Sequence, residues 1–276
     1  MLTRLCGAPR LVIDESIPTT WLEGPHRAPP QTERVALVAS YGESSTTSLS
    51  LSSLVVELES CGYSVILVRA SDSHAPLDFG DGFTGRPVIV RKPNIGYDFG
   101  SWATGMELFP TALSAPFVVT VNDSLVGPFA SLRPLLAAFE SCITDVWAAT
   151  NTTQFFPHLQ SFFMGYRHGV LADGAMRHFW RGLKIETDKQ RIIDRYELGF
   201  SRMLFGEAFS STAAYPSELV VEFGQNPSVF GWAELLELGF PFIKRELVLH
   251  PELVPDGHRI AERVESRFGV DPRAWV

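Results

Sequence analysis

The sequence predicts an α/β fold in which a mostly parallel central sheet is flanked by helices and the second half of the chain is largely helical. Three observations predict it. Short apolar runs have the length of strands buried on both faces, and the first of them is residues 35–39. Stretches with a helical spacing of apolar residues separate these runs. Hydrophobic residues make up 45% of the 276 residues and charged residues 20%, which supplies enough apolar side chain for a full core.

The first three elements form a strand–helix–strand unit. Residues 35–39 and 63–68 are apolar runs of strand length, and residues 47–61 lie between them as a helix. Gly62 stands where a helix C-cap is expected. A helix between two such strands predicts that the strands pair in parallel through a right-handed crossover. The apolar positions of the helix keep three- and four-residue spacings: Leu51, Leu54, Val55 and Leu58.

The later elements follow from the same patterns. A loop rich in Asp, Gly and Pro spans residues 72–86. Further strands are expected at residues 88–90, 117–121, 146–149 and 159–166. Further helices are expected at residues 98–109, 132–140, 170–183, 188–205 and 233–238. Because strands and helices alternate early and helices dominate later, the sheet should belong mainly to the first half, and the second half should complete a pocket beside it.

The chain divides into three parts. Residues 1–34 hold five of the 19 prolines and read as an extended arm, residues 35–250 as one domain, and residues 251–276 as a C-terminal tail or helix. No apolar run approaches the roughly 20 residues of a membrane span. The apolar run at residues 11–13 is interrupted at once by Asp14 and Glu15, so it does not read as a signal peptide. We therefore expect a cytoplasmic protein that reaches a membrane only as a peripheral protein.

Charge and cysteine content exclude some classes of protein. The formal net charge is −8 and the sequence pI about 5.4, with no basic stretch, so a nucleic-acid partner is not expected. An acidic protein that binds an anion needs local help from a metal ion or a helix N-terminus. Cys6, Cys61 and Cys142 are widely spaced and form no CxxC pair, which indicates reduced, buried thiols.

The first motif that could carry chemistry is Asn122-Asp123-Ser124, directly after the apolar run 117–121. Ligands in open α/β sheets lie outside the carboxyl ends of the strands. A carboxylate at that position can bind a divalent cation, and oxygen ligands suit Mg²⁺ or Mn²⁺. The alternative is an ordinary turn, because Asn, Asp and Ser are also the common turn residues.

The second motif is residues 91–102, Arg-Lys-Pro-Asn-Ile-Gly-Tyr-Asp-Phe-Gly-Ser-Trp, which leaves a strand and opens a helix. Gly96 and Gly100 allow close approach of the backbone, and Asp98 could act as the N-cap. A helix N-terminus here offers free N–H groups to an anion. The alternative is a capped helix after a tight turn, since neither GxGxxG nor a Walker sequence is present.

The third motif, His158-Leu159-Gln160-Ser161-Phe162, would place His158, Gln160 and Phe162 on one face of a strand. A polar pair beside aromatic rings suits a sugar-binding wall, whereas a lone histidine is more often structural.

The fourth motif is Tyr196-Glu197-Leu198 within a helical run. A carboxylate in an apolar setting gains a raised pKa and can act as a base. Other carboxylates of this region, Glu186 and Glu207, read as exposed. The alternative for Glu197 is a structural carboxylate paired with Arg195 or Arg202. The fifth motif comprises Asn226-Pro227, Trp232 and residues 241–246. Its Lys244-Arg245 pair, after an apolar stretch, is either a phosphate contact or a surface pair.

In this order the motifs resemble the rhamnan synthesis protein F family. The likeness covers roughly residues 35–248 and rests on these segments: residues 94–102, Asn122-Asp123-Ser124 with Gly127-Pro128, residues 158–163, Tyr196-Glu197, and residues 241–245. The family is similar in turn to family 2 glycosyltransferases, which implies a GT-A fold (Rossmann-like) for this chain. Asn122-Asp123-Ser124 falls where those enzymes carry a DXD motif, and Glu197 where they carry a catalytic carboxylate. Only Asp123 of the triplet is acidic, which weakens the metal expectation.

The resemblance implies an inverting glycosyltransferase that moves a sugar, with L-rhamnose as one candidate, from a nucleoside-diphosphate donor to a glycan or lipid-linked glycan of a bacterial surface polysaccharide. Glu197 is then the expected base, with Asp98 as a competitor, and Asp123→Ala should weaken donor binding without unfolding the chain. The remaining implied roles are nucleotide contact by Tyr41, Asn94, Gly96, Asp98 and Asn122, metal or ribose contact by Asp123, sugar contact by His158 and Gln160, and diphosphate contact by Lys244 and Arg245.

Two other classes stay open. A non-catalytic glycan- or nucleotide-binding protein could keep the same fold, and the single acid of the triplet favours it. A different Rossmann-like enzyme such as a methyltransferase would need a glycine-rich loop after residues 35–39, and that loop is missing.

Overall fold

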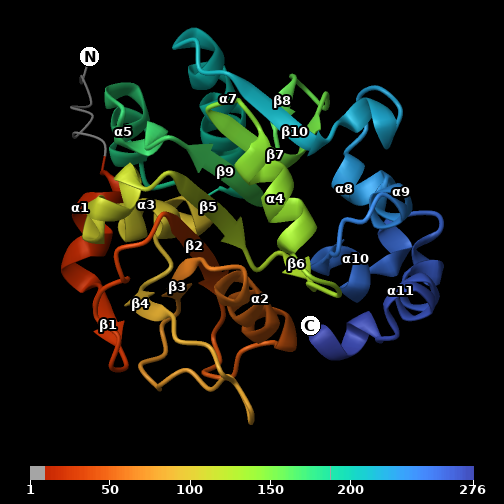
Figure 1. Ribbon diagram of the computed structural model, residues 1–276, viewed down its shortest axis with the longest axis horizontal. Coiled ribbons are helices and arrows are strands. Elements are labelled where there is room, and N and C mark those ends of the chain that lie inside the picture. Colours follow the sequence, from red (N-terminus) through yellow and green to blue (C-terminus); the bar gives the residue numbers. More distant parts are fainter. Residues whose placement is uncertain (1–9, 187) are drawn as a thin grey trace, which may run out of the picture.

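The computed structural model describes residues 10–186 and 188–276, and its centre is one large mixed sheet (Figure 1). Its strands run in the order β1-β4-β3-β2-β5-β9-β7-β10, with β8 paired to β7. The bounds are β1 Trp21–Glu23, β2 Arg34–Tyr41, β3 Ser64–Ala70, β4 Val88–Lys92, β5 Phe117–Asn122, β7 Val146–Thr152, β8 His158–Leu159, β9 Phe163–Arg167 and β10 Ser211–Tyr215. The α/β class is confirmed.

The sheet is mixed, so the prediction of a mostly parallel sheet is wrong in its second half. Strands β4, β3, β2 and β5 pair in parallel, as predicted for the strand–helix–strand unit. Strand β9, however, lies antiparallel between β5 and β7. Residues 153–162 connect β7 to β9 without a helix. A parallel return needs a crossover of a dozen or more residues, so the chain turns back on itself there.

Two layers of helix cover the sheet. One face packs against α1 (Val12–Ser16), α3 (Tyr97–Leu108), α5 (Gly174–Arg181) and α7 (Leu198–Gly206). The other face packs against α2 (Leu49–Ser60) and α4 (Arg133–Ser141). Strand β2 shows the alternation that builds both cores: Val35, Leu37 and Ala39 face the first layer, and Ala36 and Val38 the second.

The N-terminal segment from residue 11 on packs against the domain. Helix α1 lies on α3, and β1 adds an antiparallel edge strand to β4. Part of the predicted arm, residues 10–34, therefore has defined structure. Residues 1–9, with Cys6, lie outside the described residues. Cys61 and Cys142 are free and half-buried.

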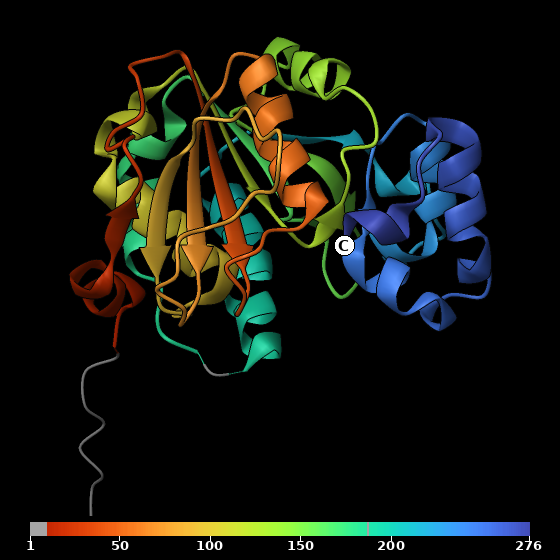
Figure 2. The same cartoon turned by 90° about the horizontal axis from the view of Figure 1, so that it is seen from below.

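A separate cluster of short helices lies beside the sheet at the C-terminal end of the chain (Figure 2). It holds α8 (Pro227–Phe230), α9 (Trp232–Glu237), α10 (Arg245–Leu249) and α11 (Ile260–Phe268), around a small two-stranded sheet of β6 (Leu125–Val126) and β11 (Ile243–Lys244). Trp232, Leu247 and Val264 belong to its core. Residues after 250 thus pack with residues before 250. No helix in the described part of the chain is long and apolar enough to cross a membrane.

Three predicted elements differ from the structure. The strand expected at 159–166 is split into β8 and β9 by residues 160–162. The helix expected at 170–183 is a 3-10 turn, η3 (Val170–Ala172), followed by α5. The helix expected at 188–205 consists of α6 (Lys189–Ile192), a π-helical turn at Ile193–Glu197, and α7. Each difference inserts irregular backbone, and π-helical turns often mark functional sites.

Candidate functional site

A polar cavity opens at the carboxyl ends of the strands and brings together much of the predicted site. Its volume is about 280 Å³. The walls come from the start of α3, the end of β5, the segment around β8, the π-helical turn, and β11. Predicted residues in its lining are Asp98, Asn122, His158, Gln160, Glu197 and Lys244. These six residues span the sequence from the first helix motif to the last strand, so only the tertiary fold makes them neighbours.

Glu197 is held at the cavity by two residues of the 158–161 segment. Its Oε2 accepts hydrogen bonds from the Ser161 backbone N–H at 3.2 Å and from the Ser161 hydroxyl, and His158 Nε2 lies 3.3 Å from its Oε1. The side chain is 21% exposed, so a ligand can reach it. The alternative partners, Arg195 and Arg202, lie elsewhere: Arg195 pairs with Glu186 at 2.7 Å and Arg202 covers the Phe156 ring.

The pKa of Glu197 is lowered, which corrects the expectation of a raised value. Burial favours the neutral acid, but the hydrogen bonds from His158 and Ser161 outweigh it. The carboxylate is therefore ionised near neutral pH, as a base must be. Glu186, expected to be exposed, has a side chain only 8% exposed because Arg195 covers it.

His158 links Glu197 to the backbone of the loop that precedes β8. Its Nδ1 lies 2.6 Å from the Phe156 carbonyl oxygen, and its Nε2 lies 3.3 Å from Glu197 Oε1. The imidazole therefore helps to fix the orientation of the Glu197 carboxylate at the cavity surface.

Asp98 and Asn122 form the opposite wall. Asn122 Nδ2 donates to Asp98 Oδ2 at 2.7 Å, and Asn122 Oδ1 accepts from the Ser124 hydroxyl at 2.6 Å and the Ser124 N–H at 3.2 Å. The triplet is thus both a turn and part of the cavity. Asp98 is not the N-cap of α3. Gly96, with φ of 80°, occupies that position, since a left-handed residue is needed there.

The glycines of the second motif allow a close approach of α3 to α1. A Cβ on Gly96 would lie 2.8 Å from the Val12 side chain, and one on Gly100 would lie 3.0 Å from it. Asn94 is exposed and outside the cavity lining. Lys92, which belongs to the second motif, is fully buried and donates to the Ile95 carbonyl at 2.8 Å. Burial lowers the pKa of Lys92 to about 7, with nearby Asp98 opposing the shift.

Asp123 lies outside the cavity and ties strand ends together. Its Oδ2 accepts from the Ser40 hydroxyl at 2.6 Å and from the Tyr41 backbone N–H at 3.2 Å, and Arg69 lies 3.8 Å away. Burial raises the pKa of Asp123; the Ser40 hydrogen bond and the charges of Arg245 and Arg69 only partly offset this effect. Tyr41 contributes its backbone, while its ring is 47% exposed.

The donor set around Asp123 does not fit a resident metal. In residues 10–186 and 188–276 no group of three or more His, Cys, Asp or Glu side chains could hold a metal ion. The one carboxylate already accepts two hydrogen bonds on one oxygen. We therefore derive no chemical step from a metal, and Mg²⁺ or Mn²⁺ dependence stays a prediction.

The remaining predicted residues differ in their position relative to the cavity. Lys244 lines the cavity, 6.0 Å from the centre of the Phe162 ring. Arg245 does not line it; its N–H donates to the Ser124 carbonyl at 2.7 Å and its guanidinium to Ser48 at 3.2 Å. Gln160 is buried, accepting from Thr150 at 2.7 Å and donating to Asn226 at 3.0 Å.

The lining also contains Phe155, which sequence reasoning missed, and Ser161 and Asn226, which belong to the third and fifth motifs but had no role assigned to them. Asn226 also caps α8, and the Asn-Pro pair at its start signals that cap. Phe155 is 78% exposed and has a φ of 65°, a conformation unusual for a bulky residue. No local pattern in the sequence predicts that Phe155 lies at the rim of a cavity.

Comparison with known proteins identifies relatives of the chain. The "Virulence protein VirA" of Vibrio anguillarum is 25% identical over 210 residues, which cover 64% of this chain and 67% of the relative. Protein y4gN of Sinorhizobium fredii is 25% identical over 147 residues, 51% of this chain and 38% of that protein. The family described as "Rhamnan synthesis protein F" matches residues 86–268, which contain every cavity residue described above. The chain belongs to the rhamnan synthesis protein F family, which indicates a role in polysaccharide synthesis.

Proposed function

We propose that the chain is a GT-A-type glycosyltransferase that moves a sugar from a nucleoside-diphosphate donor to a glycan. The observation that carries the proposal is the cavity itself, in which a held, ionised carboxylate faces a set of amide and hydroxyl side chains. Sugars offer many hydroxyl groups, and buried amides and hydroxyls match them in hydrogen bonding. The family's part in rhamnan synthesis agrees with this chemistry.

The reaction needs one base. The acceptor hydroxyl gives its proton to Glu197 Oε1, while the acceptor oxygen forms a bond to the anomeric carbon of the donor. The bond from that carbon to the phosphate oxygen breaks, and the nucleoside diphosphate leaves with the electron pair. Attack opposite to the leaving group inverts the configuration. Ser161 holds Oε2 with its N–H and hydroxyl, which fixes the direction of Oε1.

The other wall would hold the donor. Asp98 and Asn122 form a hydrogen-bonded pair that can meet a ribose or a nucleotide base, and Lys244 brings a positive charge to the cavity for the diphosphate. The parallel order β4-β3-β2-β5, with this motif directly after β5, agrees with a GT-A arrangement. We propose that the acceptor is a glycan or lipid-linked glycan, met at the cytoplasmic face of a membrane, and that L-rhamnose is one candidate sugar.

A second candidate is a non-catalytic protein that binds a nucleotide or glycan in the same cavity. The missing acid cluster around Asp123 favours it, since many nucleotide-sugar enzymes hold a metal. Both proposals expect ligand binding, whereas only the first expects a product.

The test combines binding and turnover on the full chain. Nucleoside diphosphates and their sugars are screened by thermal shift with and without Mn²⁺, and each ligand that binds is incubated alone and with rhamnan oligosaccharides. A ligand at 100 times its Kd should stabilise the fold by about 2.7 kcal/mol. Release of nucleoside diphosphate with a longer oligosaccharide supports the enzyme. Binding without any release from any donor assigns the second candidate, and no binding at all contradicts both.

A further inference from the structure

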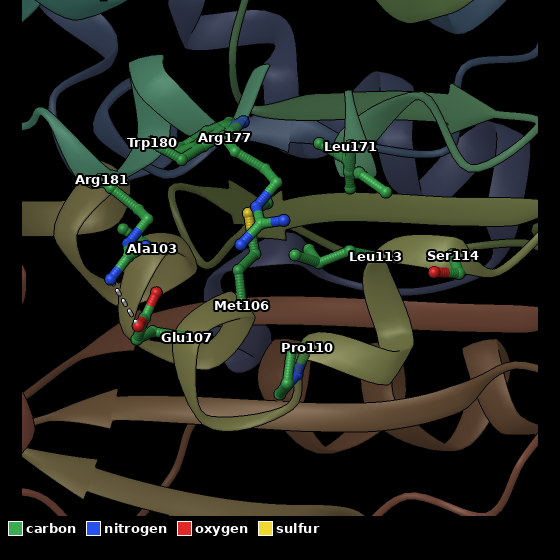
Figure 3. A pocket seen from close by; sticks show the side chains of 11 residues that line it. Ala103, Met106, Glu107, Pro110, Leu113, Ser114, Leu171, Arg177, Trp180 and Arg181 are labelled. Atoms are coloured by element: carbon green, nitrogen blue, oxygen red, sulfur yellow. Dashed lines mark ion pairs between the residues drawn. The ribbon is translucent and has the colours of Figure 1, made fainter. Parts of the chain in front are cut away.

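A second cavity lies at the other end of α3 from the candidate site. Its volume is about 350 Å³, and its walls come from α3, η2 (Pro110–Ser114), η3 and α5 (Figure 3). The first turn of α3 faces the candidate site, while Met106 and Glu107 in its last turns line this second cavity. At a rise of about 1.5 Å per residue, the two cavities are more than a turn apart along the helix. They are therefore separate sites.

Most of the second cavity is apolar. Met106, Leu171 and Trp180 form buried parts of its lining, each no more than 4% exposed, and Leu113 is half-buried beside them. A cavity of this volume falls at the lower end of the range that small organic ligands occupy. An apolar lining favours a ligand with a hydrocarbon chain or ring.

The charge on the lining is not balanced. Arg181 pairs with Glu107 at 3.3 Å, which accounts for two of its three charged residues. The third is Arg177, an exposed residue whose side chain makes no hydrogen bond or ion pair with any residue that the structure describes. Figure 3 shows its side chain reaching from α5 into the cavity. Two arginines and one glutamate leave a net charge of +1 on the lining, in a chain whose formal charge is −8.

We infer that this cavity is a binding site for an organic monoanion with a short apolar chain or ring. The Arg177 guanidinium takes the anionic group, and the apolar walls, with the Trp180 ring among them, take the hydrocarbon. Trp180 also stacks on Phe99, with ring centres 5.7 Å apart, and Phe99 lines the candidate site. The two cavities therefore share a packed aromatic contact.

The experiment measures binding of octanoate to the full chain by calorimetry, with acetate as the anion without a chain and 1-octanol as the chain without a charge. Octanoate should bind saturably and more tightly than either. Arg177→Gln should weaken octanoate binding about 10- to 100-fold, the range for one hydrogen bond to a charged group. Ala172→Phe, which places a ring into the cavity from an exposed position, should weaken it at least as much.

The matched control is Arg259→Gln, an exposed arginine in the C-terminal helical cluster, which should leave octanoate affinity unchanged. The inference is overturned by the absence of saturable octanoate binding to the parent. Equal affinity for octanoate and 1-octanol overturns it as well, as does an affinity for octanoate that neither Arg177→Gln nor Ala172→Phe alters.

Discussion

Two carboxylates at the carboxyl ends of the sheet, Glu197 and Asp123, have nearly the same partners and opposite properties. Each accepts hydrogen bonds from a serine hydroxyl and a backbone N–H on one oxygen. The pKa of Glu197 is lowered, because the hydrogen bonds from His158 and Ser161 outweigh burial, whereas burial dominates and raises the pKa of Asp123.

Position explains the difference in use. Glu197 faces the cavity beside His158, and Asp123 joins the ends of β2 and β5 beside Arg69. The comparison teaches that two carboxylates with similar hydrogen bonds can differ in their access to a cavity. Under the proposed function, this access makes Glu197 and not Asp123 the candidate base.

The largest expected effect is that of Glu197→Gln on turnover. Gln keeps the shape and can still accept from Ser161, but it cannot take a proton. Sugar transfer should fall about 10²- to 10⁴-fold, with donor affinity and melting temperature nearly unchanged. Steady-state kinetics and thermal unfolding measure both. Glu207→Gln, an exposed residue just after the same helix, is the control and should behave as the parent. Parental turnover in a folded Glu197→Gln protein would exclude Glu197 as the base.

Asp123→Ala should act on stability. The sequence alone suggested weaker donor binding in an intact fold, but the structure shows that the change leaves the buried Arg69 without its carboxylate. We expect a loss of about 2–4 kcal/mol in the free energy of unfolding, measured with urea. Asp81→Ala, in an exposed loop, should cost almost nothing. A stable Asp123→Ala protein that has lost donor binding would instead restore Asp123 to the active site.

Lys92 should make the stability of the fold depend on pH. Its pKa is about 7 in the fold, below its ordinary value of 10.5, so the folded chain binds fewer protons between these two pH values. Between pH 7 and pH 10.5, the free energy of unfolding of the parent should therefore increase with pH, by up to about 1.4 kcal/mol per pH unit. The parent should be least stable at the pH 7 end of this window. Lys92→Met should lack this slope. Parallel pH profiles of the two proteins would show that Lys92 stays charged in the fold.

The smallest effect is expected at the cavity rim. Phe155 offers an exposed ring beside Glu197, and we expect Phe155→Ala to raise the KM for the acceptor several-fold, about 1 kcal/mol, with donor KM unchanged. Phe205→Ala removes an equally exposed ring that lies outside the lining and is the matched control. A donor effect as large as the acceptor effect would place the ring on the donor side.

Much of the fold could be predicted because it depends on local patterns. The apolar runs at 35–39 and 63–68 and the helix between them give β2, α2 and β3 almost to the residue, and parallel pairing follows from the crossover. The direction of β9 could not be predicted. The direction of β9 depends on the path of the connection from β7 to β9, and the side-chain periodicity of residues 153–162 does not reveal that path.

By itself, the sequence determined the α/β class, the order of the elements and the family, because side-chain periodicity and short motifs are properties of neighbouring residues. It also identified six residues of the cavity lining: Asp98, Asn122, His158, Gln160, Glu197 and Lys244. Only the tertiary structure determined which hydrogen bonds those residues make. Ser161 and Glu197 are 36 positions apart, and Asp123 and Ser40 are 83 apart. Hydrogen bonds over such separations are set by how the sheet and helices pack, and these bonds fix which carboxylate faces a ligand and which one holds two strands together.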